Sequence, residues 1–286
     1  TACDSLSQMF ERVDVVYVLT PPSTHADIVC SAAAAGRHIV CEKPLAVTLD
    51  DGRRMVDAAR KAGVLLITSF KFRFHHGFLR LKEMVDSGSI GKLTSIWCQR
   101  IARGAGSSTE YNWRTDPALL CGMSIESLSH DIDIMRWIAG EVIDVRAVVS
   151  NTRADLPGFD NNASVSLTFD SAAVGTIHAS WSSYISLSSR GVIGTRGAAY
   201  AEGASLFDLE RFHWRTDQMP HERVDVINDR NDLSGFVAEN EHFIGCIREG
   251  KKPEVTGEDG LRALQISHAT LESSRLGSLV QPAELR

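Results

Sequence analysis

The sequence contains 286 residues, of which 43% are hydrophobic and 23% are charged, and its formal net charge is −6. This composition is typical of a soluble globular protein, and the acidic balance argues against a broad nucleic-acid-binding surface. No segment reaches the ~18 consecutive apolar residues of a membrane span, so we expect a protein that binds neither nucleic acid nor membrane.

The first part of the chain alternates apolar segments with helical ones. The apolar segments are rich in β-branched residues, which predicts strands buried on both faces of a sheet. We expect Ser23 or Thr24 to cap the first helix and Gly36 to end it, and we expect Thr48 to cap the second helix and Gly63 to end it. This order predicts parallel strands joined by right-handed crossovers. The expected strands are 13–19, 37–41 and 64–68.

The pattern changes near Phe70. After a helix over 77–87, several segments alternate apolar and polar residues, as in Val165, Leu167 and Phe169. Such alternation predicts strands with one face buried and the other available. We therefore expect a mostly antiparallel sheet with helices on one face, a second subunit on the other, and a helical C-terminal region at 233–250 and 258–277. The expected strands are 93–100, 142–151, 163–169, 174–181 and 190–201.

Three unusual residues follow the apolar strand that ends at Cys41, namely Glu42, Lys43 and Pro44. Charged groups at the carboxyl end of a buried strand lie where open α/β sheets bind their ligands. A lone lysine at a strand end is commonly solvated, but Pro44 restricts the backbone around this one. A lysine held in such a turn can donate hydrogen bonds to a substrate oxygen.

A helix is predicted over 124–139, and it carries two stripes. One stripe is apolar, and the other contains Glu126, His130, Asp133 and Trp137. At ~100° per residue the second stripe lies nearly opposite the first. It is either a solvent-exposed face or a carboxylate and an imidazole directed toward a cleft. In the second interpretation Glu126 orients His130, which then serves as a general base.

Together these features resemble the glucose-fructose oxidoreductase/inositol dehydrogenase (Gfo/Idh/MocA) family along essentially the whole chain. The resemblance rests on motifs that occur in the family's order and spacing. They are the Thr-Pro-x-x-x-His turn at 20–25, Glu42-Lys43-Pro44, Trp113-Arg114-x-Asp116-Pro117, the stretch 122–133 and the stretch 255–260.

The resemblance implies an α/β protein with an N-terminally incomplete Rossmann domain, residues 1–71. An α+β domain with a large, mostly antiparallel sheet follows, residues 72–286. The implied activity is an NAD(P)-dependent oxidoreductase (EC 1.1.1-like) that transfers hydride between NAD or NADP and a secondary alcohol of a sugar, inositol or related polyol. The alternatives are an NAD-retaining lyase or glycosidase-type relative and a non-catalytic ligand-binding protein of the same fold.

The resemblance also implies roles for single residues. Lys43 contacts the reacting hydroxyl and the cofactor, and His130 takes the hydroxyl proton with Glu126 as its paired carboxylate. The cofactor-binding residues are Thr20, Pro21, Pro22, Ser23, His25, Glu42, Lys43 and Pro44. The substrate-binding residues are Lys43, Arg73, Trp113, Arg114, Glu126 and His130.

The sequence departs from the family pattern in three places. It lacks the glycine-rich fingerprint, because the only GxG is Gly104-Ala105-Gly106, which follows no suitable βα turn. We therefore expect roughly 50–60 residues to precede residue 1 in the natural protein, judged from the size of a βαβ unit. Glu126 replaces the family's usual aspartate, and Leu128 replaces its usual glycine.

The cysteine pattern bears on metals and on location. None of the six cysteines belongs to a CxxC pair, so no metal site is expected, and a reducing cytoplasm is the simplest compartment. His75-His76 is expected to lie exposed in a polar turn. The available face of the large sheet predicts a homodimer or homotetramer.

Overall fold

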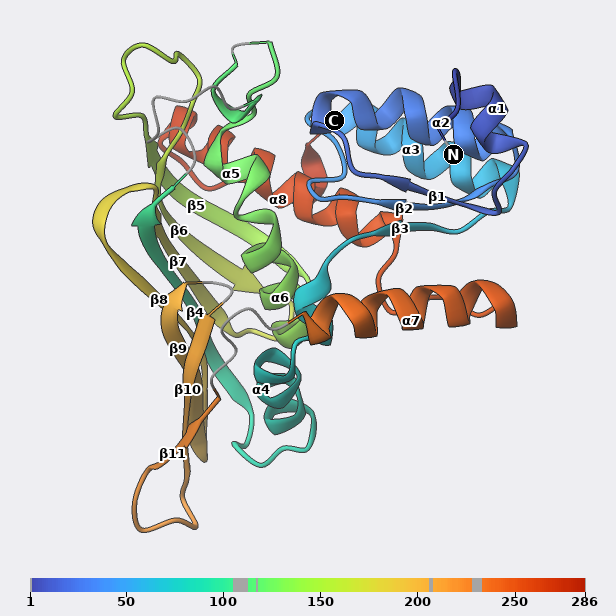
Figure 1. The fold of residues 1–286 in the computed structure, drawn as a ribbon. Helices are drawn as coiled ribbons and strands as arrows, with labels where there is room; N and C mark the ends of the chain where they lie inside the picture. Colours follow the sequence, from blue (N-terminus) through green and yellow to red (C-terminus); the bar gives the residue numbers. More distant parts are fainter. Residues whose placement is uncertain (1, 105–112, 117, 206–207, 228–232, 286) are drawn as a thin grey trace. The chain divides into compact units, whose positions relative to one another are not determined.

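The computed structural model describes residues 2–104, 113–116, 118–205, 208–227 and 233–285. Their contacts form two compact units, one made of Thr1–Phe70 and Val237–Gln265 and the other of Lys71–Phe236 and Ile266–Leu285 (Figure 1). The division falls inside α7 (Ser234–Glu249) and inside α8 (Gly257–Leu276). Sequence reasoning places everything after residue 71 in the second domain, and those domain limits stay a prediction.

The first unit is built on a parallel sheet with the strand order β1-β2-β3. In register, Val18 lies opposite Cys41, and Cys41 lies opposite Thr68. Ile39 of β2 and Ile67 of β3 are completely buried, as expected for strands covered on both faces, but Tyr17 of β1 is 41% exposed, so that expectation is wrong for β1. The predicted alternation of parallel strands and helices is therefore confirmed. The elements are α1 (Leu6–Phe10), β1 (Val15–Val18), η1 (Pro22–Thr24), α2 (His25–Ala34), β2 (His38–Cys41), α3 (Leu49–Ala62) and β3 (Leu66–Thr68).

Local chemistry sets the helix ends in this unit. Thr48 caps α3 by accepting a hydrogen bond from the Asp51 amide, and Gly63 ends it in a left-handed conformation, both as predicted. The start of α2 differs, because the Thr24 hydroxyl donates to the Pro21 carbonyl rather than capping the helix. A 3₁₀ turn that begins at Pro22 leads into α2 instead.

The second unit is built on an eight-stranded sheet with the order β11-β10-β9-β8-β4-β7-β6-β5. Only the β4–β7 pair is parallel, so the predicted mostly antiparallel sheet is confirmed for the described residues. The strands are β4 (Leu93–Arg103), β5 (Val142–Ser150), β6 (Asn162–Phe169), β7 (Val174–Ser180), β8 (Ser182–Gly194), β9 (Gly197–Ser205), β10 (Asp208–Thr216) and β11 (Arg223–Val226).

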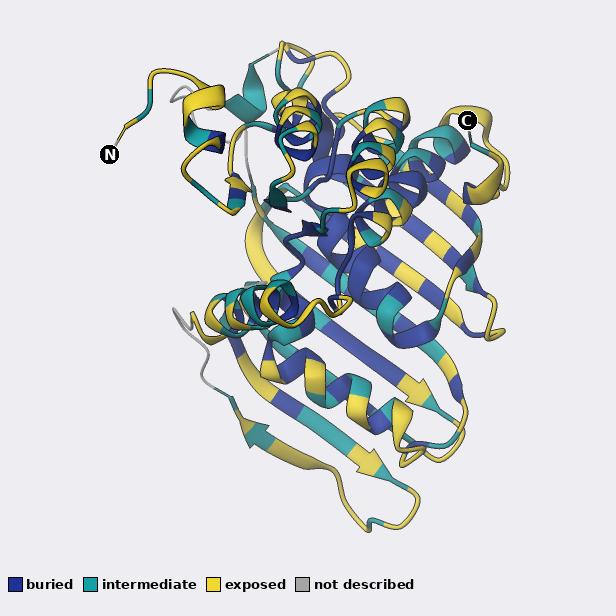
Figure 2. Ribbon diagram, turned by 90° about the vertical axis from the view of Figure 1, so that its right-hand side faces the viewer, coloured by how far each residue is buried: buried dark blue, intermediate teal, exposed yellow. Residues whose placement is uncertain are grey.

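Helices cover one face of this sheet. In β6, Val165 and Leu167 are buried while Ser164 and Ser166 are exposed, and Figure 2 shows such alternating bands along the strands. The helices of this unit lie together on one side of the sheet (Figure 1), where α4 packs on β8 and β9 and α6 packs on β4. They are η2 (Lys71–Phe74), α4 (His76–Asp86), η3 (Trp113–Thr115), α5 (Gly122–Glu126), α6 (Ser129–Ala139) and η4 (Pro282–Glu284).

Three sequence expectations for this unit are wrong. The helix expected over 124–139 is two helices, because the chain breaks at Ser127 and Leu128. The strand expected over 190–201 is divided between β8 and β9 by a turn at 195–196. His75 is buried rather than exposed, since its Nδ1 accepts a hydrogen bond from the Gly77 amide and caps α4.

Candidate active site

The first group of predicted site residues lies at one edge of the parallel sheet. Residues 20–25 follow β1, and Glu42 and Lys43 follow β2. Because these strands are parallel neighbours, their carboxyl ends meet at the same edge, which is where open α/β sheets bind ligands. The Glu42 amide also donates to the Val18 carbonyl at 2.9 Å, which extends the ladder into the turn.

His25 connects these two loops. Its imidazole is completely buried, with Nε2 2.8 Å from the Thr20 carbonyl oxygen and Nδ1 3.1 Å from that of Leu45. A second carbonyl, that of Pro44, lies 3.2 Å from Nδ1. One side chain therefore fixes the loop after β1 against the turn after β2. The sequence assigns His25 to the cofactor, and that contact stays a prediction.

Lys43 occupies an ordered turn. Its amide donates to Glu42 Oε2 at 3.1 Å, its side chain is half-buried, and Pro44 after it is buried. The peptide bond between Lys43 and Pro44 is cis. The lysine is thus carried by a turn whose backbone is held on both sides, as the stiffened strand end in the sequence predicts.

The second group of predicted site residues lies at the break between α5 and α6. Glu126 is the last residue of α5, and His130 is the second residue of α6. Both side chains are buried, with 6% of each residue exposed, and Asp133 on the same stripe is 1% exposed. These values exclude the solvent-exposed interpretation of the stripe. They leave a carboxylate and an imidazole enclosed within this unit.

Two further predicted residues contact the Glu126 carboxylate or stack beside it. Arg114 Nη2 donates to Glu126 Oε1 at 3.1 Å, and its guanidinium lies 4.3 Å from the centre of the Trp113 ring. The structure therefore brings Trp113, Arg114 and Glu126 together. Their contact with a substrate stays a prediction. Separately, the His130 ring packs edge to face against the Phe72 ring, with 4.6 Å between ring centres.

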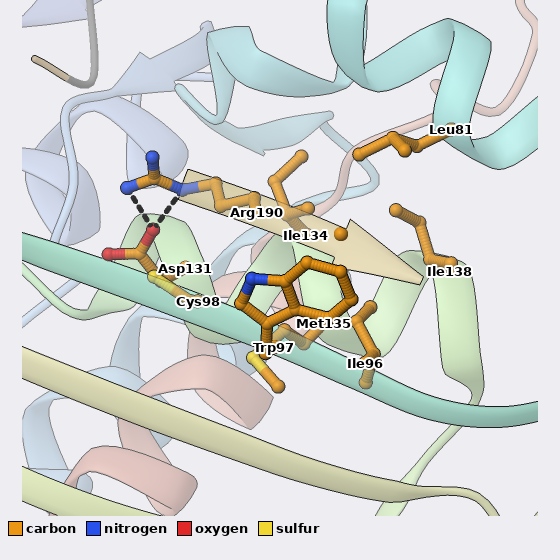
Figure 3. A pocket seen from close by; sticks show the side chains of 10 residues that line it. Leu81, Ile96, Trp97, Cys98, Asp131, Ile134, Met135, Ile138 and Arg190 are labelled. Carbon is orange, nitrogen blue, oxygen red and sulfur yellow. Dashed lines mark hydrogen bonds and ion pairs between the residues drawn. The ribbon is translucent and has the colours of Figure 1, made fainter. Parts of the chain in front are cut away.

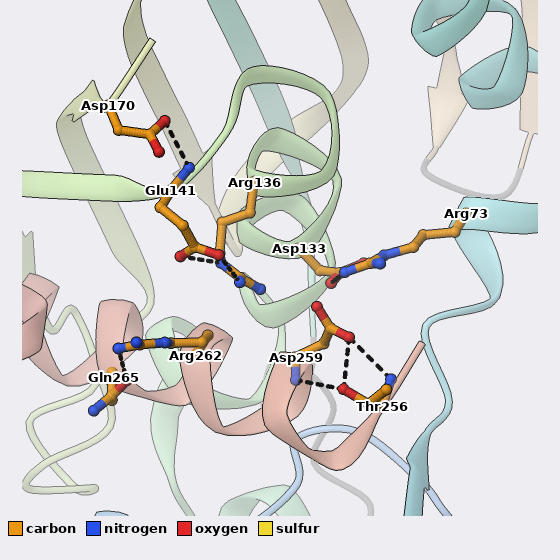
Figure 4. A network of polar contacts seen from close by, with 9 residues as sticks. All are labelled: Arg73, Asp133, Arg136, Glu141, Asp170, Thr256, Asp259, Arg262 and Gln265. Atoms are coloured by element: carbon orange, nitrogen blue, oxygen red, sulfur yellow. Dashed lines mark hydrogen bonds and ion pairs between the residues drawn. The ribbon is translucent and has the colours of Figure 1, made fainter. Parts of the chain in front are cut away.

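Arg73 makes a buried forked ion pair with Asp133 (Figure 4). Its Nε donates to Asp133 Oδ2 at 2.9 Å and its Nη2 to Oδ1 at 2.6 Å, and both side chains are almost fully buried. Burial of a carboxylate requires a partner of this kind. The pair ties η2 to α6. The predicted contact between Arg73 and a substrate is untested, and the observed contact is structural.

Sequence reasoning missed a buried charge cluster around Asp131. Arg190 on β8 approaches Asp131 Oδ1 with its Nε and its Nη2, each at 2.7 Å (Figure 3), and Arg100 Nη1 on β4 lies 3.2 Å from Oδ2. Burial raises the pKa of the Asp131 carboxyl, but the Arg190 and Arg100 guanidiniums outweigh it and hold the pKa below its usual range. The available signal was register, because each arginine lies two positions from an inward-facing residue of its strand, Arg100 from Cys98 and Arg190 from Val192.

Two cavities formed by described residues are lined by none of the predicted site residues. The one beside Asp131 and Arg190, drawn in Figure 3, measures about 10 Å³, which suits one water at most. A larger one of about 180 Å³ opens beside Leu65 and Leu66, at the amino end of the parallel strands and so away from Lys43. No cluster of three or more potential metal ligands occurs in the described part of the chain. Ala105, Gly106 and Pro117, which belong to the sequence motifs, lie outside it.

Comparison with known proteins agrees with this arrangement. Residues 1–70 match the profile of the oxidoreductase family with an NAD-binding Rossmann fold, and residues 78–200 match the GFO/IDH/MocA C-terminal domain. The chain is 30% identical over 268 residues to myo-inositol 2-dehydrogenase of Thermotoga maritima, a match that covers 92% of this chain and 78% of that protein. The chain belongs to the Gfo/Idh/MocA family.

Other members of the Gfo/Idh/MocA family show comparable similarity. Scyllo-inositol 2-dehydrogenase (NAD(+)) of Bacillus subtilis is 29% identical over 276 residues, covering 94% of this chain and 78% of that protein. The crystal structure of aldose-aldose oxidoreductase from Caulobacter crescentus complexed with glycerol has a TM-score of 0.83 at 27% identity, covering 96% of this chain and 81% of that one. The predicted family and fold class are thus confirmed. None of the helices described here combines the length and hydropathy needed to cross a bilayer.

Proposed function

We propose that the protein is an NAD(P)-dependent dehydrogenase that transfers hydride between a nicotinamide cofactor and a secondary alcohol of a sugar, inositol or related polyol. The observation that carries the proposal is the pair of buried acid–base groups, Glu126 and His130, at one helix break of a family member. The relatives named above act on inositols or aldoses by their names, which supports the substrate class.

The loops after β1 and β2 suit a dinucleotide. They follow the carboxyl ends of adjacent parallel strands. The completely buried His25 side chain holds the two loops together. When bound, the nicotinamide would accept the hydride from the substrate carbon. We assign the cofactor, NAD or NADP, to Thr20, Pro21, Pro22, Ser23, His25, Glu42, Lys43 and Pro44.

The acid–base chemistry belongs to the chain itself. Lys43 donates a hydrogen bond to the reacting oxygen and stabilises the negative charge that develops on it. His130 accepts the hydroxyl proton as general base, which contributes typically 10²–10⁴-fold to such a step. Glu126, whose carboxylate is held by Arg114, stabilises the imidazolium that forms. Arg73, Trp113 and Arg114 complete the assigned substrate-binding set.

We also propose a cytoplasmic homodimer or homotetramer that assembles through the uncovered sheet face. All six cysteines are thiols, which suits a reducing compartment. Large apolar side chains are exposed on the strands of the sheet, which is typical of an interaction surface. They are Val148, Val174, Tyr184, Ile185, Leu187 and Ile193.

Thermal melting with NAD and with NADP tests the proposal. A nucleotide that binds only the native state raises the melting temperature, by the equivalent of about 2.7 kcal/mol at 100 times its Kd. AMP serves as the control because it lacks the nicotinamide. Incubation of the protein with NAD or NADP and a panel of inositols and sugars, followed at the absorbance band of the reduced nucleotide, then identifies the substrate. Absence of both a melting shift and nucleotide reduction would refute the proposed function.

A further inference from the structure

The relative position of Glu126 and His130 depends on the break between their helices. Ser127 and Leu128 separate α5 from α6, so the two side chains do not share one continuous helix. A break is a hinge unless other contacts hold it. The Ser129 hydroxyl donates to the Glu126 carbonyl across this break at 3.1 Å, and any further contact that fixes α5 against α6 must come from the rest of the chain.

Arg100 on β4 contacts both sides of this break. Its Nη2 donates to the Ser127 hydroxyl, and its Nη1 lies 3.2 Å from Asp131 Oδ2. Ser127 directly follows Glu126, and Asp131 directly follows His130. A single guanidinium thus joins the neighbour of the carboxylate to the neighbour of the imidazole.

The surroundings make this bridge rigid. Arg100 and Ser127 are each 9% exposed and Asp131 is 1% exposed, so water does not compete for the contacts. Asp131 is held from its other side by Arg190, at 2.7 Å. A planar guanidinium with several fixed N–H groups can serve two acceptors at once, whereas an ammonium on a flexible stem cannot hold both in the same geometry.

We propose that Arg100 is a positioning residue, whose guanidinium spans the break and fixes the Glu126 carboxylate against the His130 imidazole. As regards catalysis, the inference rests on the dehydrogenase function proposed above. Arg100 touches neither group directly and acts through Ser127 and Asp131.

The first test is Arg100→Lys, which keeps the buried charge and loses the fork. We expect kcat to fall by about 10- to 100-fold, because small displacements of reacting groups have effects of this size. The matched control is Arg136→Lys, which removes a forked pair between the buried Arg136 guanidinium and the exposed Glu141 carboxylate at the opposite end of α6. It should lower the melting temperature and leave kcat near that of the parent protein.

A double-mutant cycle separates bridging from general destabilisation. Ser127→Ala removes only the hydroxyl acceptor and is mild enough to fold. If the bridge acts as one unit, Arg100→Lys and Ser127→Ala lower kcat in the same direction, and the double variant loses little more than the worse single one. Strictly additive losses would contradict the bridge.

A readout without turnover keeps the inference independent of the proposed function. In protein labelled with ¹⁵N-histidine, the His130 imidazole signals are assigned from their loss in His130→Gln. We expect Arg100→Lys and Ser127→Ala to move these signals and Arg136→Lys to leave them in place. If the parent protein has no dehydrogenase activity, the proposed function fails while this test still applies. Unmoved signals together with a folded Arg100→Lys variant would overturn the positioning role.

Discussion

Lys43 and His130 carry their proposed roles in different surroundings. Lys43 is half-buried on a turn after a parallel strand. His130 is 6% exposed and packs against the Phe72 ring, so it is shielded from bulk water. A shielded imidazole takes its proton from a bound hydroxyl rather than exchanging it freely with solvent.

Single substitutions at these two residues test their roles. We expect Lys43→Ala and His130→Ala each to lower kcat by ~10²-fold or more, the scale for positioned acid–base groups. Lys61→Ala, at an exposed helix position, and His76→Ala, an exposed histidine, are the matched controls and should turn over normally. Steady-state kinetics with saturating cofactor measures the effect, and near-normal turnover in a Lys43 or His130 variant would remove that residue from the mechanism.

The candidate site was partly predictable at this scale. The i, i+4 spacing identified Glu126 and His130 as candidate site residues, and the charged residues at the strand end identified Lys43. The contact between Arg114 and Glu126 was not predictable, because it joins residues 12 apart through a loop whose path the sequence does not encode in any periodic pattern. Arg100 was missed for another reason. An arginine in a strand is normally read as outward-facing, whereas here burial is possible because Asp131 neutralises it.

At the level of elements, α6 is held by carboxylate–guanidinium pairs along its length. Near the start of α6, Asp131 pairs with Arg190. In the middle of the helix Asp133 pairs with Arg73, and at its end Arg136 pairs with Glu141. The helix is therefore buried almost all round, although its sequence looks amphipathic. Charged side chains that would face solvent on an isolated helix instead attach it to β8, η2 and the start of β5.

Replacement of Asp131 tests how much this attachment contributes. Asp131→Asn leaves the Arg100 and Arg190 guanidiniums against a neutral amide, so we expect the free energy of unfolding at pH 7 to fall by about 3–5 kcal/mol. The pKa of Asp131 is lowered in the folded protein, so its stabilisation is complete above the unfolded pKa of about 3.9 and is lost as the pH falls through the folded value.

Urea unfolding of the parent protein and of Asp131→Asn at pH 7 and at successively lower pH below 4 measures this dependence. The difference between the two proteins should be largest at neutral pH and should shrink on acidification. Asp155→Asn is the control, because this exposed carboxylate pairs with Arg153 at the surface and should matter little. A difference that grows in acid would contradict the assigned sign.

Element prediction failed where local pattern and tertiary contact disagree. The apolar and polar periodicity continues through Ser127 and Leu128, so nothing in the local pattern marks the break. The turn at 195–196 does carry a local signal, because Gly194 and Gly197 flank Thr195 and Arg196, and the strand predicted over 190–201 overlooked it. β10 was not predicted because a register shift at Leu209 places its buried residues, Leu209 and Phe212, three positions apart. β11 was not predicted because it has no buried residue and shows no hydrophobic face. Strands 13–19, 37–41 and 64–68 were found because each contains a run of apolar, mostly β-branched residues between turn signals.

At the scale of the whole molecule, one face of the large sheet carries exposed apolar side chains. Ile185 is 76% exposed and Leu187, two positions along β8 and so on the same face, is 38% exposed. Apolar side chains that remain this exposed in a monomer favour association or aggregation. Assembly through this face would account for both.

A charge placed on this strand tests the proposed assembly. We expect Ile185→Asp combined with Leu187→Asp to convert the oligomer to a smaller species, because two carboxylates would be buried without partners at the interface. Light scattering coupled to size-exclusion chromatography gives the mass directly. Leu276→Asp, at an exposed helix position, is the control. A monomeric parent protein, or an unchanged mass in the double variant, would contradict assembly through β8.

The way the chain divides between the two units sets an order of events during synthesis. Residues 71–236 leave the ribosome before Val237–Gln265, which the first unit needs, and Ile266–Leu285, which the second unit needs, emerges after both. Nascent domains fold once their residues are available. We therefore expect the first unit to stay incomplete until Gln265 has emerged and the second until Leu285 has emerged. A translation product that ends before residue 237 would leave both units unfinished and dependent on chaperones.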